Sequence, residues 1–358
     1  MTEKPKRNEL IKSIGVDGYI DELRLYINNN KEDKLAKIDL YKILLKTGEY
    51  KEFEILYHEL RKSNPIPIVY REFGRYLLFA KFDYQRAKKV LRKAIEVNKN
   101  EPAWVYYFAG LEYTYYEKMC DGLLYTAIPK NASTSLKSFI LDSVLKQSDS
   151  NPHSVFGNPF FKTLHYTDKE IANSTKVLVL REPSARFYSY FNKNVKEEDS
   201  LAYEYNVDSK IQAELFNLKL QPTIEEFVGN FWNYCLVFND VLHHTLPQAA
   251  YIGSLNKYDY ICDISEVDDL VKFVANKLDV KGIEKAPKKM IPKKKKKTVN
   301  EEDKIKDFIS LIYDYDYKLI SRNLNILNPK ISTYFENPNK YADEMSKINF
   351  TKRTITHD

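Results

Sequence analysis

One stretch decides the fold: Leu123-Leu124-Tyr125-Thr126-Ala127-Ile128-Pro129-Lys130-Asn131-Ala132-Ser133-Thr134-Ser135-Leu136-Lys137. Its first six residues form a mainly apolar run that predicts a buried strand, and apolar residues at helical spacing follow from Ser133 to Leu145. A strand that passes through a short polar loop into a helix brings backbone N–H groups and the positive end of the helix dipole to one point. Lys130 adds a full positive charge there. The stretch therefore predicts an anion-binding loop.

This loop differs from the one that binds nucleoside triphosphates. The triphosphate loop reads GxxxxGK[ST], with glycines that let the backbone wrap the phosphates and a lysine near its end. Residues 129–135 contain no glycine, and their lysine comes near the start. We therefore expect the loop to hold one phosphate-sized group rather than a triphosphate with magnesium.

A second strand, turn and helix follows at residues 176–191, with Pro183 suited to a first helical turn. Arg181 stands at the carboxyl end of the strand, the edge where open α/β sheets bind ligands. Ser189 comes eight residues later, about two turns into the helix. Because a guanidinium fork and a hydroxyl suit a phosphate, we expect this pair to form a second phosphate site.

From residue 119 onward the pattern is that of an α/β domain. Short apolar runs alternate with helical spacing, which favours a parallel sheet flanked by helices. We place this domain at residues 119–335 and a polar tail at residues 336–358. The expected strands are Leu123–Ile128, Val177–Leu180, Ala250–Ile252 and Tyr258–Ile264, and the expected helices are Ser133–Leu145, Ala185–Lys196, Thr223–Asn239, Glu266–Leu278 and Glu301–Asn323.

Residues 1–118 have a different pattern. Apolar residues recur at helical spacing from about residue 18 onward without strand alternation, which predicts an all-α domain. Two segments, 45–50 and 79–84, are alike at an offset of 34 residues. This period resembles a tetratricopeptide (TPR) array of helical hairpins, and an irregular helical domain with a chance repeat is the alternative.

The composition is that of a globular protein. The chain has 358 residues, enough for about two domains, with 43% apolar and 30% charged residues and a formal net charge of +6. Nothing predicts a membrane span, and the modest charge argues against nucleic acid as a partner. The first nine residues are mostly polar or charged where an export signal would be apolar, so we expect a cytoplasmic location. Three widely spaced cysteines predict neither a disulfide framework nor a cysteine metal pair.

Both phosphate motifs resemble those of sulfotransferases that use PAPS (3′-phosphoadenosine 5′-phosphosulfate), especially the Golgi-type carbohydrate enzymes. In that family the first loop binds the 5′-phosphosulfate, and an arginine with a serine eight residues later binds the 3′-phosphate. The resemblance implies a P-loop-kinase-like core, PAPS as the co-substrate and no metal ion. The residues that it assigns to PAPS are Lys130, Asn131, Ala132, Ser133, Thr134, Ser135, Arg181 and Ser189.

The resemblance continues downstream. The family has His-x-x-Pro-Gln and Tyr-Asp-x-Ile stretches, which are similar to His244-Thr245-Leu246-Pro247-Gln248 and Tyr258-Asp259-Tyr260-Ile261. Residues 312–319 resemble the family's final helix. The likeness thus covers about residues 120–325, and it implies a glycan hydroxyl as the acceptor, with His244 in the acceptor site.

Sulfuryl transfer needs charge stabilisation at the leaving oxygen and a base for the attacking hydroxyl. We expect Lys130 to neutralise the departing 5′-phosphate. His165 lies between the two PAPS motifs, where related sulfotransferases often place a catalytic histidine, so it is our candidate base. His244 is the rival, and a glutamate base, which some carbohydrate sulfotransferases use, stays open.

Three questions stay open. The lysine-rich segment 285–297 is either a solvated loop or, as the resemblance implies and as we favour, a lid over the nucleotide. The helical domain is expected to bind a protein partner or to shape the acceptor site. The alternative functions are a small-molecule kinase of the same architecture and a helical-repeat scaffold that binds nucleotide without catalysis.

Overall fold

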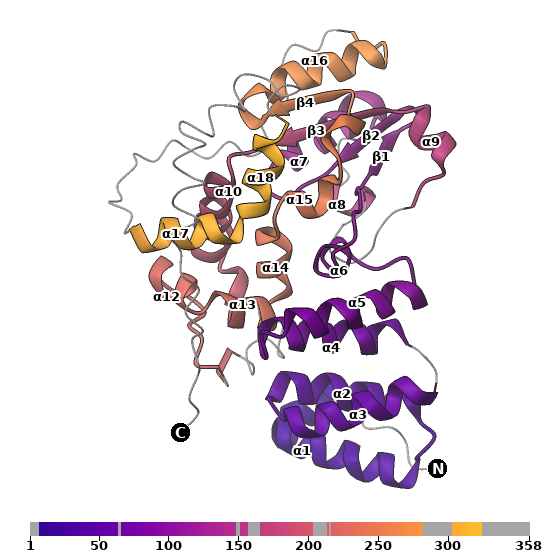
Figure 1. The fold of residues 1–358 in the computed structure, drawn as a ribbon, viewed down its shortest axis with the longest axis vertical. Helices are drawn as coiled ribbons and strands as arrows, with labels where there is room; N and C mark the ends of the chain where they lie inside the picture. The colour runs from indigo at the N-terminus through magenta and orange to yellow at the C-terminus, as the bar shows by residue number, and fades with distance from the viewer. Residues whose placement is uncertain are drawn as a thin grey trace. The chain divides into compact units, whose positions relative to one another are not determined.

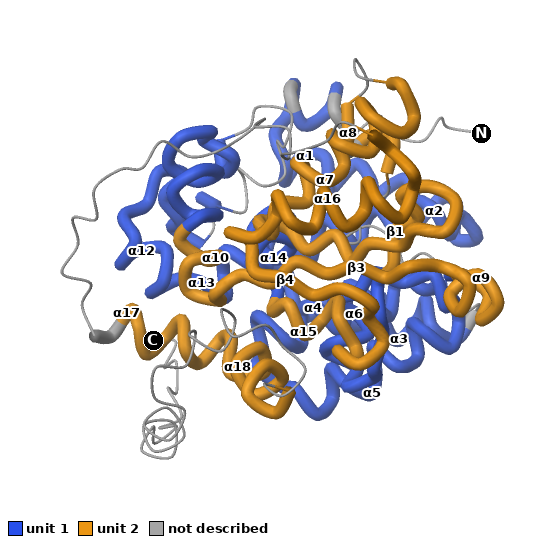
Figure 2. The backbone as a smooth tube through the Cα atoms, turned by 90° about the horizontal axis from the view of Figure 1, so that it is seen from above, with its two compact units in different colours: residues 1–115, 157–165, 189–246 blue, residues 116–156, 166–188, 247–358 orange. Residues whose placement is uncertain are grey.

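The structure is a computed structural model, and it describes residues 7–63, 66–147, 151–156, 165–202, 213–214, 216–281 and 303–323. The chain forms two compact units, which Figure 2 colours separately. Unit 1 comprises residues 1–115, 157–165 and 189–246, and unit 2 comprises residues 116–156, 166–188 and 247–358. The break after Tyr115 lies near the expected boundary at residue 118, but residues 189–246 belong to unit 1. The domains 1–118 and 119–335 stay predictions, and the tail 336–358 lies outside the described residues.

Unit 1 begins with helices that pack in sequential pairs, α2 on α3 and α4 on α5 (Figure 1). Asp33 and Asp83 start the helices α2 and α5, because each carboxylate accepts a hydrogen bond from a backbone N–H of the first turn. The first residues of α3 and α5 are Tyr50 and Tyr84, which reproduces the 34-residue offset of the sequence. The all-α prediction is confirmed, and the TPR likeness stays a prediction. The helices are α1 (Arg7–Asn29), α2 (Lys34–Thr47), α3 (Tyr50–Ser63), α4 (Pro67–Phe79), α5 (Tyr84–Val97) and α6 (Ala103–Phe108).

Large and small residues interlock between these helices. Tyr57 of α3 stacks on Phe73 of α4, with ring centroids 3.6 Å apart. Gly74 lets α4 approach α5, because a Cβ at this position would lie 2.3 Å from Leu91 Cδ2. The spacing of the second pair therefore depends on the absence of a side chain at Gly74.

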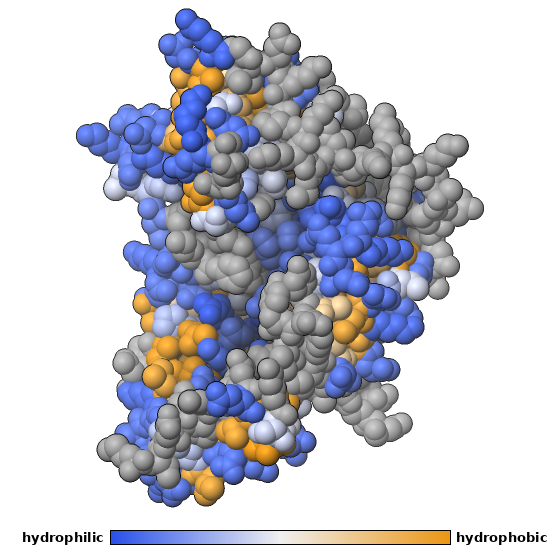
Figure 3. Space-filling view, turned by 180° about the vertical axis from the view of Figure 1, so that it is seen from behind, coloured by the Kyte–Doolittle hydropathy of each residue, from blue (hydrophilic) through white to orange (hydrophobic). Residues whose placement is uncertain are grey.

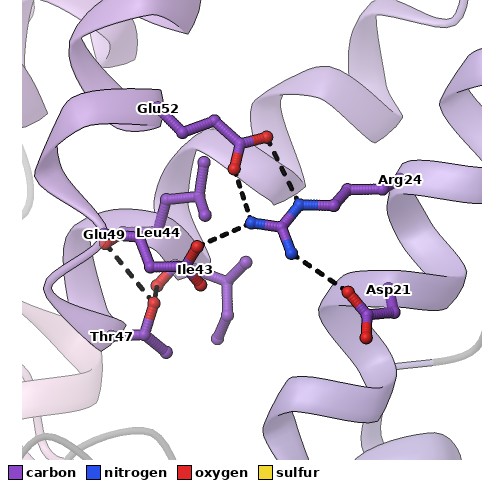
Figure 4. Close-up of polar contacts among 7 residues, drawn as sticks. All are labelled: Asp21, Arg24, Ile43, Leu44, Thr47, Glu49 and Glu52. Carbon is purple, nitrogen blue, oxygen red and sulfur yellow. Dashed lines mark hydrogen bonds and ion pairs between the residues drawn. The ribbon is translucent and has the colours of Figure 1, made fainter.

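Arg24 links α1 to the next helix pair through Glu49 and Glu52, and it also contacts Asp21 of its own helix (Figure 4). Its Nη2 contacts Glu49 Oε2 at 2.6 Å and Glu52 Oε2 at 2.5 Å, and its Nη1 contacts Asp21 Oδ1 at 3.0 Å. The Arg24 side chain is 34% exposed, so solvent screens these ion pairs and each contributes at most about 1 kcal/mol. The cluster mainly fixes the orientation of α1.

The second part of unit 1 packs on α4. Arg75 is buried and donates from Nη2 to the Cys235 carbonyl at 2.8 Å and from Nη1 to the Asn239 side chain. Phe79 stacks on Trp232 with ring centroids 6.0 Å apart. The N-terminal helices and residues 231–245 thus share one core. The elements of this part are η2 (Phe191–Glu197), η3 (Ser200–Ala202), α12 (Ile224–Gly229), α13 (Phe231–Val237) and α14 (Asn239–Thr245).

Unit 2 is built on a four-stranded sheet of order β1-β2-β3-β4. Three strands are parallel, β2 (Leu123–Thr126), β3 (Thr175–Leu180) and β4 (Tyr260–Asp263), and the edge strand β1 (Glu117–Cys120) is antiparallel to β2. Thr126 pairs with Leu178, so the carboxyl ends of β2 and β3 meet at one edge. The predicted fold class is confirmed, a mostly parallel sheet flanked by helices after an all-helical region. The flanking elements are α7 (Ser133–Phe139), η1 (Ile140–Val144), α8 (Pro152–Val155), α9 (Asp168–Ala172), α10 (Pro183–Tyr190), α15 (Ala249–Ile252), η4 (Leu255–Lys257), η5 (Ile264–Glu266), α16 (Val267–Lys277), α17 (Asp303–Ile312) and α18 (Asp314–Ser321).

The strand predicted at Ala250–Ile252 is wrong, because these residues lie in the short helix α15. The carboxylate of Asp316 accepts hydrogen bonds from the backbone N–H groups of Gln248 and Ala249. A distant side chain therefore caps this helical turn, and the apolar run alone could not indicate that.

Two long predicted helices are divided. The helix expected at Glu301–Asn323 is interrupted at Tyr313, between α17 and α18. The helix expected at Thr223–Asn239 is interrupted at Asn230, between α12 and α13, and again at Phe238, before α14. Helical spacing of apolar residues continues across these breaks, so periodicity did not locate them.

Among the residues coloured in Figure 3, most of the visible surface is hydrophilic, with apolar side chains in small groups. Leu35 on α2 and Ile55 on α3 are exposed apolar residues. Across the described ranges, every helix is too short or too polar to cross a membrane.

Candidate active site

The anion loop connects β2 to α7, as the sequence predicts. Lys130 and Ala132 both adopt the left-handed backbone conformation, with φ of 69° and 57°. This conformation costs a non-glycine residue about 1–2 kcal/mol, and it persists only where the surroundings hold it. The side chains of the loop and of the first helical turn, Lys130 and Ser133 to Ser135, are half-buried. A cation and several hydroxyls therefore lie on a constrained loop, a donor set suited to a phosphate or a sulfate.

Asn131 holds this loop on the sheet. Its side chain is fully buried, and Nδ2 donates to the Val179 carbonyl at 2.9 Å and to Gln248 Oε1 at 2.6 Å. The Tyr125 hydroxyl donates to the Asn131 carbonyl at 3.2 Å. The Asn131 N–H also donates to the Ile128 carbonyl at 3.2 Å, so Asn131 fixes the loop in place through its side chain and its backbone.

Arg181 follows β3 and meets the loop. Its Nη1 donates to the Lys130 carbonyl at 3.0 Å, although the two residues are 51 positions apart. Its backbone N–H donates to Gln248 Oε1 at 3.2 Å, and its carbonyl accepts from Gln248 Nε2 at 2.9 Å. The structure therefore brings together Lys130 and Arg181, the leading residues of the two predicted phosphate motifs.

Helix α10 is fixed to the loop by Arg186. This side chain is fully buried, and its Nε donates to the Pro129 carbonyl at 3.0 Å. The Glu182 carboxylate caps the start of the helix through the Ser184 N–H, and it also accepts from the Tyr317 hydroxyl at 2.6 Å. These contacts set the direction in which α10 leaves the sheet.

Ser189 lies near the end of α10, and its side chain is half-buried. One helix, α10, therefore carries the chain from the turn after Arg181 to Ser189. Ser189 is assigned to unit 1 and Arg181 to unit 2, so a common phosphate for this pair stays a prediction.

A buried carboxylate stands behind Gln248. Asp316 of α18 accepts from the backbone N–H of Gln248 at 2.9 Å and of Ala249 at 2.7 Å. Burial raises the pKa of Asp316 to about 6, although the two N–H groups and the nearby Arg186 act to lower it. Asp316 therefore loses its negative charge in mildly acidic solution.

His165 belongs to unit 1. Its ring is exposed, and Nε2 contacts the Lys99 carbonyl at 2.7 Å. Because a carbonyl only accepts hydrogen bonds, this contact favours the tautomer that carries a hydrogen on Nε2. The contact orients an imidazole that solvent can reach.

His244 lies on α14, also in unit 1. Its Nε2 lies 3.3 Å from Asp240 Oδ1, and its ring stacks on Tyr190 with centroids 5.1 Å apart. Burial acts to raise the pKa of Asp240, but hydrogen bonds from His244 and Tyr190 outweigh it and lower this pKa to about 2. A carboxylate that stays ionised thus orients the His244 ring, while the Nδ1 atom of that ring is buried.

Sequence reasoning missed the residues that support these groups. Asp240 stands four residues before His244, a helical spacing that could have identified it. Gln248 lay within a recognised stretch without an assigned role, and nothing local marks Arg186 or Asp316 as buried. The lysine-rich segment 285–297, predicted as a lid, lies outside the described residues.

Comparison with known proteins gives one match. A family model described as "Sulfotransferase family" matches residues 116–321, more than half of the chain. The matched range contains both phosphate motifs as well as Gln248 and Asp316. No curated protein and no solved structure matches the chain. In the described part of the chain, no group of His, Cys, Asp and Glu side chains is placed to hold a metal ion.

Proposed function

The chain belongs to the sulfotransferase family, and we propose that it transfers a sulfuryl group from PAPS to a hydroxyl, with a glycan as the acceptor. The observation that carries the proposal is the hydrogen bond from Arg181 Nη1 to the Lys130 carbonyl at 3.0 Å. It joins a cationic, hydroxyl-rich loop to an arginine at the carboxyl edge of the sheet. Two phosphate-binding groups at one edge suit a nucleotide that carries phosphates at both its 5′ and 3′ positions.

Lys130 and the hydroxyls of Ser133, Thr134 and Ser135 would hold the 5′-phosphosulfate. Arg181 and Ser189 would hold the 3′-phosphate. Their half-burial supports these roles, because such side chains are both held in place and open to a ligand. Ala132 would contribute its backbone N–H, and Asn131 would hold the loop in place, which agrees with its buried amide.

The proposed reaction is one in-line displacement. The acceptor oxygen forms a bond to sulfur while the bond between sulfur and the 5′-phosphate oxygen breaks, and the acceptor proton passes to a base. Lys130 stabilises the negative charge that develops on the departing phosphate. The products are the sulfated acceptor and PAP (3′-phosphoadenosine 5′-phosphate), and the reaction needs no oxidant and no metal ion.

We propose His165 as the base. Its Nε2 contacts the Lys99 carbonyl, which orients an exposed ring that a ligand can reach. His244 is the alternative, since Asp240 orients it, but its Nδ1 is buried. We therefore assign His244 to the acceptor site.

The N-terminal helices support the acceptor side in this proposal. Arg75 of α4 holds the Cys235 carbonyl and the Asn239 side chain, at the start of the helix that carries Asp240 and His244. These contacts lie within unit 1. The N-terminal helices can therefore shape the acceptor site through these contacts, without a protein partner.

The test is incubation of the full chain with radiolabelled PAPS and a panel of glycans, steroids, phenols and peptides. Transfer of label to a glycan is the expected result. Transfer only to another class would correct the acceptor, and PAP binding without any transfer would indicate the scaffold. Transfer of phosphate from ATP in place of sulfate from PAPS would overturn the proposal in favour of a kinase.

A further inference from the structure

We propose that Gln248 is a positioning residue that holds the two phosphate motifs at a fixed separation, and thereby sets the preference for a nucleotide with phosphates at both 5′ and 3′ positions. The inference rests on the proposed function. It concerns a side chain that touches no ligand and acts through Asn131 and Arg181.

One amide bridges both motifs. Gln248 Oε1 accepts from Asn131 Nδ2 at 2.6 Å and from the Arg181 N–H at 3.2 Å, and Gln248 Nε2 donates to the Arg181 carbonyl at 2.9 Å. The side chain is fully buried, so water does not replace these partners. A buried group that loses its partner costs about 1–3 kcal/mol, which makes this arrangement specific for a carboxamide.

The Gln248 amide takes the place of a neighbouring strand. Strand β3 ends at Leu180, and the next residue, Arg181, has both its N–H and its C=O bound by Gln248. A strand neighbour satisfies the backbone in the same paired manner. The backbone of Arg181 is thereby fixed one residue beyond the strand, where its guanidinium reaches the Lys130 carbonyl.

Asp316 in turn fixes the position of Gln248. The Asp316 carboxylate accepts from the Gln248 N–H at 2.9 Å, and it lies 3.5 Å from Gln248 Nε2. Because the carboxylate attracts the donor end of the amide, Nε2 points toward Asp316 and the Arg181 carbonyl, and Oε1 faces Asn131. Helix α18 therefore defines the orientation of an amide that joins the loop to the strand.

The consequence concerns ligand selection. A nucleotide with one phosphate needs only one motif, so the separation of the motifs does not affect its binding. A nucleotide with two phosphates gains from both motifs only if their separation matches its own. Removal of the Gln248 bridge should therefore weaken the binding of PAP more than the binding of AMP.

The experiment is calorimetric titration of the full chain with PAP and with AMP. Gln248→Met keeps an unbranched side chain of similar size and removes every polar contact of that side chain, while the backbone bond to Asp316 remains. The ratio of PAP to AMP affinity should fall about tenfold, the effect of roughly one hydrogen bond. Thr126→Val is the matched control, because Thr126 is a fully buried residue of β2 whose hydroxyl lies 2.8 Å from the Tyr258 hydroxyl. That variant should keep the wild-type ratio.

An unchanged ratio of PAP to AMP affinity in a folded Gln248→Met protein would overturn the inference. An equal fall of this ratio in Thr126→Val would also overturn it. If Gln248→Met does not fold, Gln248→Asn retains an amide that is one methylene too short to bridge both motifs, and the same fall is expected. A different result would contradict the proposed function. A wild-type protein that binds PAP no better than AMP would contradict the PAPS assignment itself, whatever the variants do.

Discussion

Replacing Asp316 with asparagine should change how the stability of the protein depends on pH. Burial raises the pKa of Asp316 to about 6 in the folded chain, from an ordinary 3.8. A carboxyl group whose pKa is raised by folding binds its proton more tightly in the folded state. Its contribution to stability is therefore complete below about pH 4 and is lost as the pH rises through 6. The difference between the two pKa values corresponds to about 3 kcal/mol of unfolding free energy.

Asparagine does not titrate, so the difference in unfolding free energy between the two proteins isolates this group. Urea unfolding of both proteins from pH 4.5 to pH 7.5 should show the variant gaining about 2 kcal/mol relative to the wild type, the part of the effect that falls in this range. A difference that stays constant with pH would refute the argument from burial. A slope of the opposite sign would mean that the attraction of Arg186 outweighs burial at Asp316.

The other predictions concern the reaction. Lys130→Ala should lower kcat by about 10² or more in a sulfate-transfer assay, because it removes the charge that stabilises the leaving phosphate, and near-normal turnover would refute this role. Arg181→Ala should weaken PAP by about 1.5–3 kcal/mol in calorimetry, the scale of a hydrogen bond to a charged group, while AMP binding changes little. His165→Ala should abolish most turnover and leave PAP affinity unchanged, whereas His244→Ala should raise the acceptor KM more than it lowers kcat. The reverse pattern would exchange the two histidines.

The features that could be predicted from sequence are those encoded locally. The strand, loop and helix around Lys130 follow from a change of apolar spacing within some twenty residues. Strand β3 and the place of Arg181 at its end follow in the same way. That the two motifs meet could also be expected, because parallel strands end at one edge of a sheet.

The buried network around Gln248 could not be predicted in this way. Asn131 and Gln248 are 117 residues apart, and Gln248 and Asp316 are 68 apart. No periodicity relates such positions, and each residue by itself suits an exposed surface. Helix α15 was mistaken for a strand for the same reason, since its cap comes from Asp316.

The edge strand β1 shows a different limit. Its sequence Glu117-Lys118-Met119-Cys120 alternates in burial, but the buried position at its start is a charged residue. Glu117 is buried because Lys137 of α7 reaches it at 2.8 Å, and both side chains are nearly inaccessible. Because the buried ion pair places a charged residue at a core position, the hydropathy pattern alone does not identify β1 as a strand.

The choice of aspartate over asparagine at residue 316 can be explained by the count of donors. Two consecutive backbone N–H groups, of Gln248 and Ala249, point at its two oxygens, Oδ2 at 2.9 Å and Oδ1 at 2.7 Å. Asparagine has one oxygen and would turn an NH₂ group toward one of these donors, leaving a buried N–H unsatisfied at a cost of about 1–3 kcal/mol. Ionised aspartate satisfies both donors, but its raised pKa shows that ionisation still carries a net cost of about 3 kcal/mol in the folded chain. At neutral pH these costs are of similar size, so Asp316→Asn should differ from the wild type less in its stability at one pH than in the slope of stability with pH.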